Sequence, residues 1–245
     1  MMSVIGSAES WSKLFQGISL LGLGLVPLIL IRAMMISSAI ESQVYVVGFS
    51  FITICLLGAI VGLRPSTCST SRFIGFNHQT RDTEQDTSFS KEPPVRRGHH
   101  YRCEDFSTHV LNIGENVFCA GCTGLSTGAA IAIVGSLFYF IIGVPLVVPE
   151  VIFWTGFAGV AVGIDQHRVY RVLGNPRGAF RFMLNVIFAL GAFLLLAGAD
   201  QLAGSIAVDS YILLIALFWI YTRIAMSKTE HNRICSQCST KLCRT

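Results

Sequence analysis

The chain has 245 residues, of which 52% are hydrophobic and only 13% are charged, and its formal net charge at pH 7 is +4. Soluble domains contain roughly 25% charged residues, so this composition excludes an ordinary water-soluble globule and indicates an integral membrane protein. The modest positive charge fits a surface of anionic lipid headgroups and does not require nucleic acid as a partner. We therefore expect a cell-membrane protein whose main partner is the lipid bilayer.

Six apolar segments are long enough to form transmembrane helices, which need about 20 residues at about 1.5 Å per residue. They cover residues 14–33, 43–63, 124–145, 147–164, 179–199 and 206–225. The fourth segment is the shortest and has Pro149 near its start, so a tilted helix or a locally thinner bilayer would suit it. The sequence therefore predicts an all-α, multi-pass membrane protein with about six spans.

The first apolar segment also has an alternative interpretation as a cleaved signal peptide, because Lys13 precedes it and small residues follow it. Its length, with Arg32 directly after it, favours a retained membrane anchor. Lysine and arginine gather after the second and fourth predicted helices and in the C-terminal tail, whereas the third and fifth connections contain none. The positive-inside rule then predicts that both termini and the Cys/His loop are cytoplasmic.

The order of apolar and polar segments divides the chain into five predicted parts. These are an N-terminal transmembrane hairpin (1–63), a flexible polar linker (64–98), a Cys/His metal-binding loop (99–123), a four-helix transmembrane module (124–226) and a cysteine-containing cytoplasmic tail (227–245). The linker is rich in polar residues and contains two prolines, which is typical of a segment without a packed core. Small-residue patterns at Gly124–Gly128 and Gly159–Gly163 predict close helix contacts in the module.

The predicted loop, which ends in CAGCT, is dense in potential metal ligands. Six side chains of this loop are candidate zinc ligands: His99, His100, Cys103, His109, Cys119 and Cys122. Reduced cytosolic thiols favour metal binding over a structural disulfide. Cys119 and Cys122 form a C-x-x-C pair, and Cys103 with His109 would complete a tetrahedral set, with His99 or His100 as alternatives. The competing interpretation is a group of unrelated thiols and histidines.

A zinc ion in this loop could be structural or catalytic. Four protein ligands make a closed structural site, whereas a water in one position allows hydrolytic chemistry. Glu104, Asp105 and Glu115 are nearby candidates for a general base. Because the residues do not decide between these alternatives, enzyme activity stays unassigned.

The fourth connection, GIDQHRVYRVLGNPRGAFRF, is the second concentration of polar residues. Arg177 and Arg181 are four residues apart and therefore share one helical face, and guanidinium groups bind phosphate in a bidentate manner. Together with Asp165, they predict an interfacial site for a lipid or another anionic, phosphate-containing ligand, and they are the candidate catalytic residues. Alternatively, the arginines only fix the helix at the membrane surface, and Asp165 pairs with Arg168.

Three elements resemble a family of prokaryotic polytopic membrane proteins that is classed as a domain of unknown function: CAGCTGLSTG (119–128), GIDQ (163–166) and GNPRGAFR (174–181). That family has a C-x-R-C-T-G signature and a later D-G-x-x-Q element followed by Asn and Arg. This chain has Ala120 and Gly121 between the cysteines, where the family has Arg in the second place, and its His99–His100 pair resembles an archaeal variant. The resemblance, over residues 98–191, implies a membrane location and paired motifs without an established activity.

The tail predicts a second, weaker metal site formed by His231, Cys235, Cys238 and Cys243. An unstructured tail or acylated cysteines are the alternatives. For the whole chain, the first functional interpretation is an interfacial site for a lipid or anionic ligand beside a zinc site. The others are a non-catalytic subunit or assembly protein that docks a membrane-complex partner through its zinc knuckle, and a thiol redox or metal-handling protein.

Overall fold

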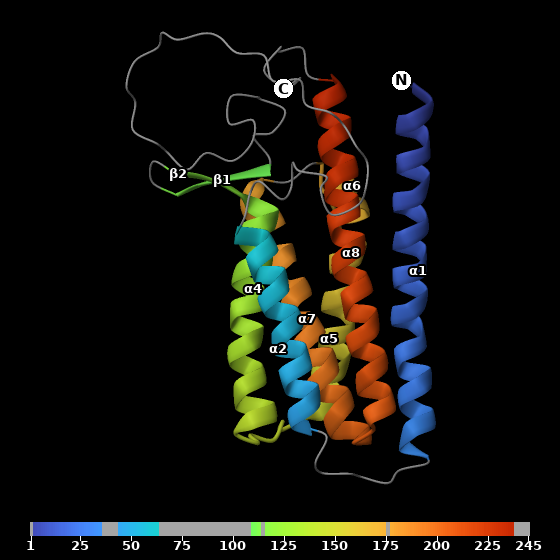
Figure 1. Cartoon of the computed structure of the whole chain (residues 1–245), viewed down its shortest axis with the longest axis vertical. Coiled ribbons are helices and arrows are strands. Elements are labelled where there is room, and N and C mark those ends of the chain that lie inside the picture. Colours follow the sequence, from blue (N-terminus) through green and yellow to red (C-terminus); the bar gives the residue numbers. More distant parts are fainter. Residues whose placement is uncertain (1, 36–43, 64–108, 114–115, 175–176, 238–245) are drawn as a thin grey trace.

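The computed structural model describes residues 2–35, 44–63, 109–113, 116–174 and 177–237. Its helices are α1 (Met2–Met34), α2 (Val44–Leu63), α4 (Ala120–Ser136), η4 (Leu137–Ile141, a π-helical turn), α5 (Pro149–Ile164), α6 (Gln166–Val172), α7 (Gly178–Ala203) and α8 (Ile206–Gln237). Two short strands, β1 (Val110–Ile113) and β2 (Asn116–Cys119), form a hairpin. The long helices lie side by side along one axis, and the hairpin lies over the start of α4, at the end of the bundle where α1 begins and α8 ends (Figure 1). We call this end the hairpin end.

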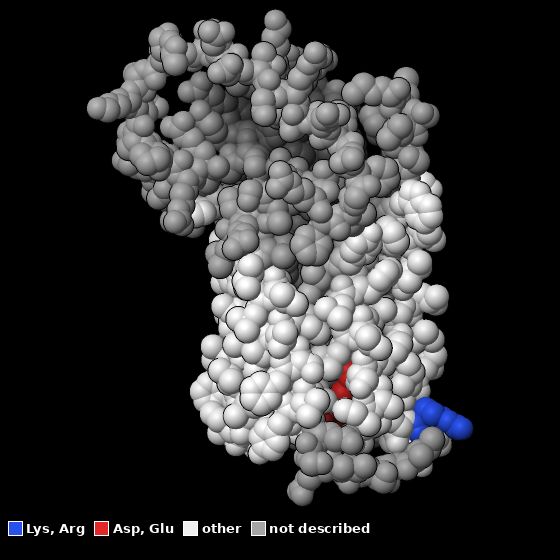
Figure 2. Space-filling model, viewed as in Figure 1, with Lys and Arg blue, Asp and Glu red and all other residues white. Residues whose placement is uncertain are grey.

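Each of the six predicted apolar segments contains a helix among the described residues, although residues 142–148 are not helical, so the prediction of an all-α fold is confirmed at this level. In the part of the chain that the structure describes, four helices are long and apolar enough to cross a membrane: Ser10–Met34, Ala120–Ile141, Gly178–Ala203 and Ile206–Ser227. The other two predicted spans correspond to shorter apolar helices, Val44–Ile60 and Pro149–Ile164. Large apolar side chains such as Leu21 and Leu214 point outward, and the described part of the face in Figure 2 has almost no charged side chains. Such a surface suits lipid chains.

Helix α7 is the core of the bundle, with α4 and α5 packed closely on it. The small-residue patterns permit this approach: a Cβ added at Gly128 would come within 2.8 Å of the Ala189 Cβ, and one at Gly163 within 2.6 Å of the Phe188 Cβ. Apolar side chains gain little from meeting each other in lipid, so close backbone packing is an effective source of helix association. The predicted role of both glycine patterns in packing is therefore confirmed.

The first two helices pack mainly against later helices. Ser19 of α1 shares a buried 2.8 Å hydrogen bond with Thr222 of α8, and its carbonyl accepts a 3.2 Å bond from Trp219 Nε1. Helix α2 packs on α4, where Ser126 Oγ donates to the Ala59 carbonyl at 3.3 Å. The predicted N-terminal hairpin is thus built into the four-helix module.

Two features of the hairpin end differ from the sequence prediction. The hairpin pairs Val110 with Cys119 and Ile113 with Asn116 in a segment that was expected to be a loop. Helix α8 continues to Gln237, about three turns beyond the predicted end of the sixth span. Both features place polar side chains over the start of α7.

Candidate functional site at the hairpin end

Cys119 and Cys122, here called the thiol pair, lie where β2 passes directly into α4. Cys119 is the residue before the first turn of the helix, and Cys122 lies in that turn. The pKa of Cys119 is lowered from 9.0 to about 6, mainly because the Cys122 thiol hydrogen-bonds to the Cys119 thiolate. Burial alone would raise this pKa. The backbone N–H groups of Cys122 and Gly121, and the nearby His109, lower it further. A helix N-terminus is a setting in which thiolates are stabilised. The thiol pair is therefore suited to metal binding or to thiol chemistry.

His109, which immediately precedes β1, faces Glu230 near the end of α8. Its Nε2 lies 3.5 Å from Glu230 Oε1, and Arg181 Nη1 lies 3.4 Å from the same oxygen. Burial alone would raise the pKa of Glu230. The stronger effects of His109 and Arg181, with a smaller contribution from His167, lower this pKa to about 2. Glu230 is therefore ionised at neutral pH and joins the hairpin to α7 and α8.

The guanidinium of Arg181 is buried between Glu230 and the ring of Tyr170, which lies 4.1 Å away. The Tyr170 hydroxyl in turn donates to Gln166 Oε1 at 2.8 Å. Burial raises the pKa of Tyr170, with the nearby Arg223 and Arg181 opposing this and Glu230 adding to it. Tyr170 is thus a neutral hydrogen-bond donor at neutral pH.

A second buried guanidinium, that of Arg223 on α8, connects three helices. Its Nη1 donates to the Gly163 carbonyl of α5 at 2.9 Å, and its Nη2 donates to Asn185 Oδ1 of α7. The Asn185 amide also donates to the Arg181 carbonyl at 2.7 Å. We call Tyr170, Arg181, Asn185, Arg223 and Glu230 the arginine cluster. It contains two guanidinium groups and one carboxylate.

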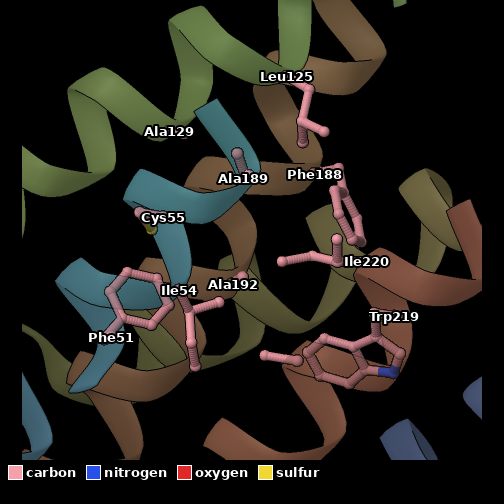
Figure 3. Close-up of a pocket in the computed structure, with 12 residues that line it drawn as sticks. Phe51, Ile54, Cys55, Leu125, Ala129, Phe188, Ala189, Ala192, Trp219 and Ile220 are labelled. Atoms are coloured by element: carbon pink, nitrogen blue, oxygen red, sulfur yellow. The ribbon is translucent and has the colours of Figure 1, made fainter. Parts of the chain in front are cut away.

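An apolar cleft begins beside the arginine cluster, between α2, α4, α7 and α8 (Figure 3). Its walls include Phe51, Leu125, Phe188, Trp219 and Ile220. Phe188 belongs to both features, because its ring centre also lies 5.4 Å from the Arg223 guanidinium carbon. A polar site and an apolar cleft therefore share one wall.

The predicted residues of the fourth connection take separate partners. Asp165 Oδ1 accepts a 2.7 Å hydrogen bond from Gln16 of α1 and lies 3.4 Å from Arg168 Nε, as in the alternative interpretation of this motif. Arg177 is exposed at the start of α7, and Arg181 is in the arginine cluster. Asp165 and Arg181 thus lie at the same end of the bundle with different contacts.

The predicted metal site is only partly within the described residues. His99, His100, Cys103, Glu104, Asp105, Glu115, Cys238, Cys243 and the side chains of His231 and Cys235 lie outside them. Within the described part of the chain, no group of three or more His, Cys, Asp or Glu side chains is placed to bind a metal ion. The structure describes three of the predicted ligands, namely the thiol pair and His109. His109 is next to Val110, which pairs with Cys119 across the hairpin.

Several residues of this end were not predicted from the sequence. Glu230 lies beyond the predicted sixth span, and Tyr170 and Asn185 are ordinary in composition, so no local signal marks them. Arg223 had a usable signal, since an ionisable side chain within an apolar span is expected to have a specific partner. The sequence also contained a usable signal for the β-hairpin, because two runs with β-branched and aromatic residues flank Gly114-Glu115.

Comparisons of this chain with protein-family models, with curated proteins and with solved structures find no match. The family resemblance of the CAGCTG element stays a prediction. Function is therefore inferred from the geometry of the hairpin end.

Proposed function

We propose that this protein is a multi-pass membrane protein that binds an anionic lipid at the hairpin end. The negative headgroup contacts the arginine cluster, and an acyl chain enters the apolar cleft. The observation that supports this is the position of Phe188, whose ring lines the cleft and contacts the Arg223 guanidinium. A ligand that is charged at one end and apolar at the other fits such a site, because binding sites combine an apolar lining with a few placed polar groups.

The charges at the hairpin end favour a negative headgroup. Arg223 is 6% exposed, and the hydrogen-bond acceptors of its guanidinium, Gly163 O and Asn185 Oδ1, are both uncharged. Exposed Arg171 and Arg177 add positive charge at the same end. Arginine binds phosphate oxygens through two parallel hydrogen bonds, so a phosphate headgroup is the anion that this end suits best.

The proposal assigns a zinc ion to the thiol pair and His109, with further ligands from His99, His100 or Cys103. The donors fit: thiolate sulfur and imidazole nitrogen are ligands that Zn²⁺ prefers, and the ionised form of Cys119 is favoured. Bound zinc would neutralise the thiolates and fix the hairpin to α4. The hairpin also contacts α7, since Val110 packs directly on Gly178, so zinc would stabilise the wall that lies over the arginine cluster.

The proposal also includes six spans, with α2 and α5 as the two short ones, and a cytoplasmic hairpin end. The described lysine and arginine side chains support this orientation, because Lys13, Arg168, Arg171 and Arg177 lie toward the hairpin end and Arg32 toward the other end. Single cysteines introduced next to Arg32 and Arg171 should react with a membrane-impermeant thiol reagent from opposite sides. Reaction of both from the same side would contradict this topology.

Lipid binding can be measured through Trp219, which lines the cleft. In a Trp11→Phe/Trp154→Phe background, Trp219 is the remaining tryptophan of the chain. The protein is reconstituted into zwitterionic bilayers that contain a small fraction of an acyl-brominated lipid, either phosphatidylglycerol or phosphatidylcholine. Bromine quenches tryptophan on contact, so we expect stronger quenching by the anionic lipid at equal mole fraction. One basic contact at a membrane surface contributes about 1 kcal/mol, which corresponds to about a fivefold preference.

The matched variants are Arg223→Gln and Arg32→Gln, which remove one arginine at each end of the bundle. Arg223→Gln should abolish the preference for the anionic lipid, and Arg32→Gln should leave it unchanged. Arg171→Gln/Arg177→Gln, in which only exposed side chains change, provides a second test that does not depend on the buried structure and should weaken the preference. Equal quenching by the two lipids in the parent protein would overturn the lipid proposal.

A thiol redox function is the second candidate, and the lowered pKa of Cys119 favours it. The two functions differ in metal content and thiol reactivity. The zinc proposal expects stoichiometric zinc in the purified protein, its loss in Cys119→Ser, and slow alkylation of Cys119 until a chelator is added. Rapid alkylation without a chelator, in protein that contains no zinc, would instead support redox chemistry. This outcome concerns the thiol pair and leaves the lipid test independent.

A further inference from the structure

Two acidic side chains are buried at the end of the bundle opposite the hairpin. Asp200 lies in the last turn of α7 and Asp209 in the first turn of α8, and they are 9% and 2% exposed. The connection between the helices is short and ends α7 at Gly204, which has φ 53° and donates its N–H to the Asp200 carbonyl at 2.7 Å. This left-handed glycine lets α8 return directly alongside α7, which places the two aspartates next to each other.

The described residues supply too few hydrogen-bond donors to these aspartates for both carboxyl groups to be charged. The Tyr139 hydroxyl of η4 donates to Asp200 Oδ2 at 2.7 Å. The Asp209 carboxyl lies within hydrogen-bonding reach of the Asp200 carboxyl. The Oδ1 atom of Asp209 is fully enclosed and has no hydrogen-bond partner among the described residues. A hydrogen bond between two carboxyl groups requires a proton, since an ionised carboxylate is only an acceptor.

The other charged groups that the structure describes near this end do not compensate the pair. Arg32 at the end of α1 and Glu150 at the start of α5 are both exposed, and no described ion pair includes Asp200 or Asp209. Of the other tyrosines on the surrounding helices, Tyr45 is exposed and Tyr211 donates to the Gly22 carbonyl at 2.9 Å. Two adjacent negative charges in apolar surroundings are strongly unfavourable. A positive ligand is therefore needed here.

We propose that Asp200 and Asp209 form a proton-binding site, in which the two carboxyl groups share one proton and the Tyr139 hydroxyl stabilises the charge that remains. On release, the O–H bond of the pair breaks and the proton passes to water at this membrane surface. The pair is then doubly negative, and the Asp209 carboxylate must move toward solvent or toward a cation. This site is at the far end of the bundle from the proposed lipid site and does not depend on it.

Gln201 gives the site a structural connection to the neighbouring loop. Its side chain accepts from the Leu146 N–H at 2.8 Å and donates to the Leu146 carbonyl at 3.0 Å, so the segment between η4 and α5 is attached one residue after Asp200. Tyr139 belongs to the same stretch of chain and contacts Asp200 directly. A change in the protonation of the pair would therefore alter the attachment of this segment to the α7–α8 turn.

Infrared spectroscopy of the full-length protein in bilayers tests the proposal, because a protonated carboxyl group has a carbonyl band that a carboxylate lacks. We expect this band at neutral pH, its disappearance on alkaline titration, and its absence in Asp209→Asn and in Asp200→Asn. Glu150→Gln is the matched control, because it removes an exposed carboxyl at the same end, and it should keep the band. Tyr139→Phe keeps both carboxyl groups and should shift the frequency of the band while retaining it.

Three results would overturn the proposal. The first is the absence of a protonated carboxyl band at neutral pH in the wild-type protein, and the second is its persistence in both single Asn variants. The third is a loss of the band at constant neutral pH when Na⁺, Mg²⁺ or Ca²⁺ is added, which would make the pair a metal-cation site. If the Asn variants do not fold, the band and its response to Tyr139→Phe still test the shared proton.

Discussion

The two ends of this bundle solve the same electrostatic problem in opposite ways. At the hairpin end, Arg181 and Glu230 are of opposite sign and lie 3.4 Å apart, so each charge is compensated by the other. At the far end, Asp200 and Asp209 have the same sign and can coexist only if a proton or another cation joins them. Burial therefore predicts ion pairing at one end and protonation at the other. Charge state in a membrane bundle depends on which partner the neighbouring helix supplies.

The largest effect is expected from Arg223→Met at the hairpin end. This change leaves the Gly163 carbonyl and Asn185 Oδ1 without their donor in a buried place, at a cost of about 3 kcal/mol. Unfolding of the detergent-solubilised protein by a denaturing detergent would measure it. Arg168→Met is the control, because the Arg168 side chain is 71% exposed, and its effect should stay below about 0.5 kcal/mol. Equal effects of the two variants would show that the buried guanidinium is not a structural link.

Acid should destabilise the hairpin end through Glu230. Its pKa is lowered from 4.5 to about 2 in the folded protein, so the folded state binds a proton less readily than the unfolded state. The stabilisation is complete above about pH 5 and is lost as the pH falls from 4.5 toward 2. One pKa unit corresponds to about 1.4 kcal/mol, and the partial exposure of this side chain suggests a total of about 2 kcal/mol. Unfolding free energies at about pH 5 and about pH 3 should differ by most of this amount in the wild type and converge in Glu230→Gln.

Replacing one carboxyl group at each end by an amide should show most directly that the two ends differ, because the two changes in stability should be unequal. Glu230→Gln removes the charge that faces Arg181 and His109, and it should destabilise the protein by about 1–2 kcal/mol at neutral pH. Asp209→Asn only replaces a carboxyl that already shares a proton, so its effect should be within about 0.5 kcal/mol. Both variants are measured in the same thermal unfolding assay. A larger loss for Asp209→Asn than for Glu230→Gln would reverse the comparison.

A modest effect is expected from Gln201→Ala at the far end. Two hydrogen bonds to Leu146 are lost, but this side chain is exposed and water replaces it, so the cost should be about 0.5–1 kcal/mol. Hydrogen exchange should show faster exchange of the Leu146 amide, with the amides of α4 unchanged. An unchanged rate at Leu146 would mean that Gln201 does not fix this segment.

The sequence was informative where the bilayer itself imposes a pattern. Length and apolar content predicted the helices, and glycine spacing predicted where they approach closely. The pattern could not predict which apolar residues face the core, because lipid and protein interior are equally apolar: Leu21 is 67% exposed and Leu23, on the same helix, is 1% exposed. The packing of α1 on α8, through Ser19 and Thr222, was therefore not predictable.

The same limit applies to the two polar sites. The C-x-x-C spacing of the thiol pair is local, so it was recognised, whereas the partners of Arg181 depend on contacts between distant segments. Glu230 is 49 positions from Arg181 along the chain, and the polar composition after Ser227 gave no sign that α8 continues to it. Asp200 and Asp209 are closer in sequence, but their contact depends on the short turn at Gly204.

Helix α8 contains Asp209 in its first turn and both Arg223 and Glu230 farther along, and it is continuous from Ile206 to Gln237. At about 1.5 Å per residue, Asp209 and Glu230 are about 32 Å apart along its axis, close to the thickness of the hydrocarbon layer. An unbroken helix of this length tilts or turns as one rod. A movement that draws Asp209 away from Asp200 would also displace Arg223 relative to Asn185, so the two ends of the bundle are mechanically connected through a single element.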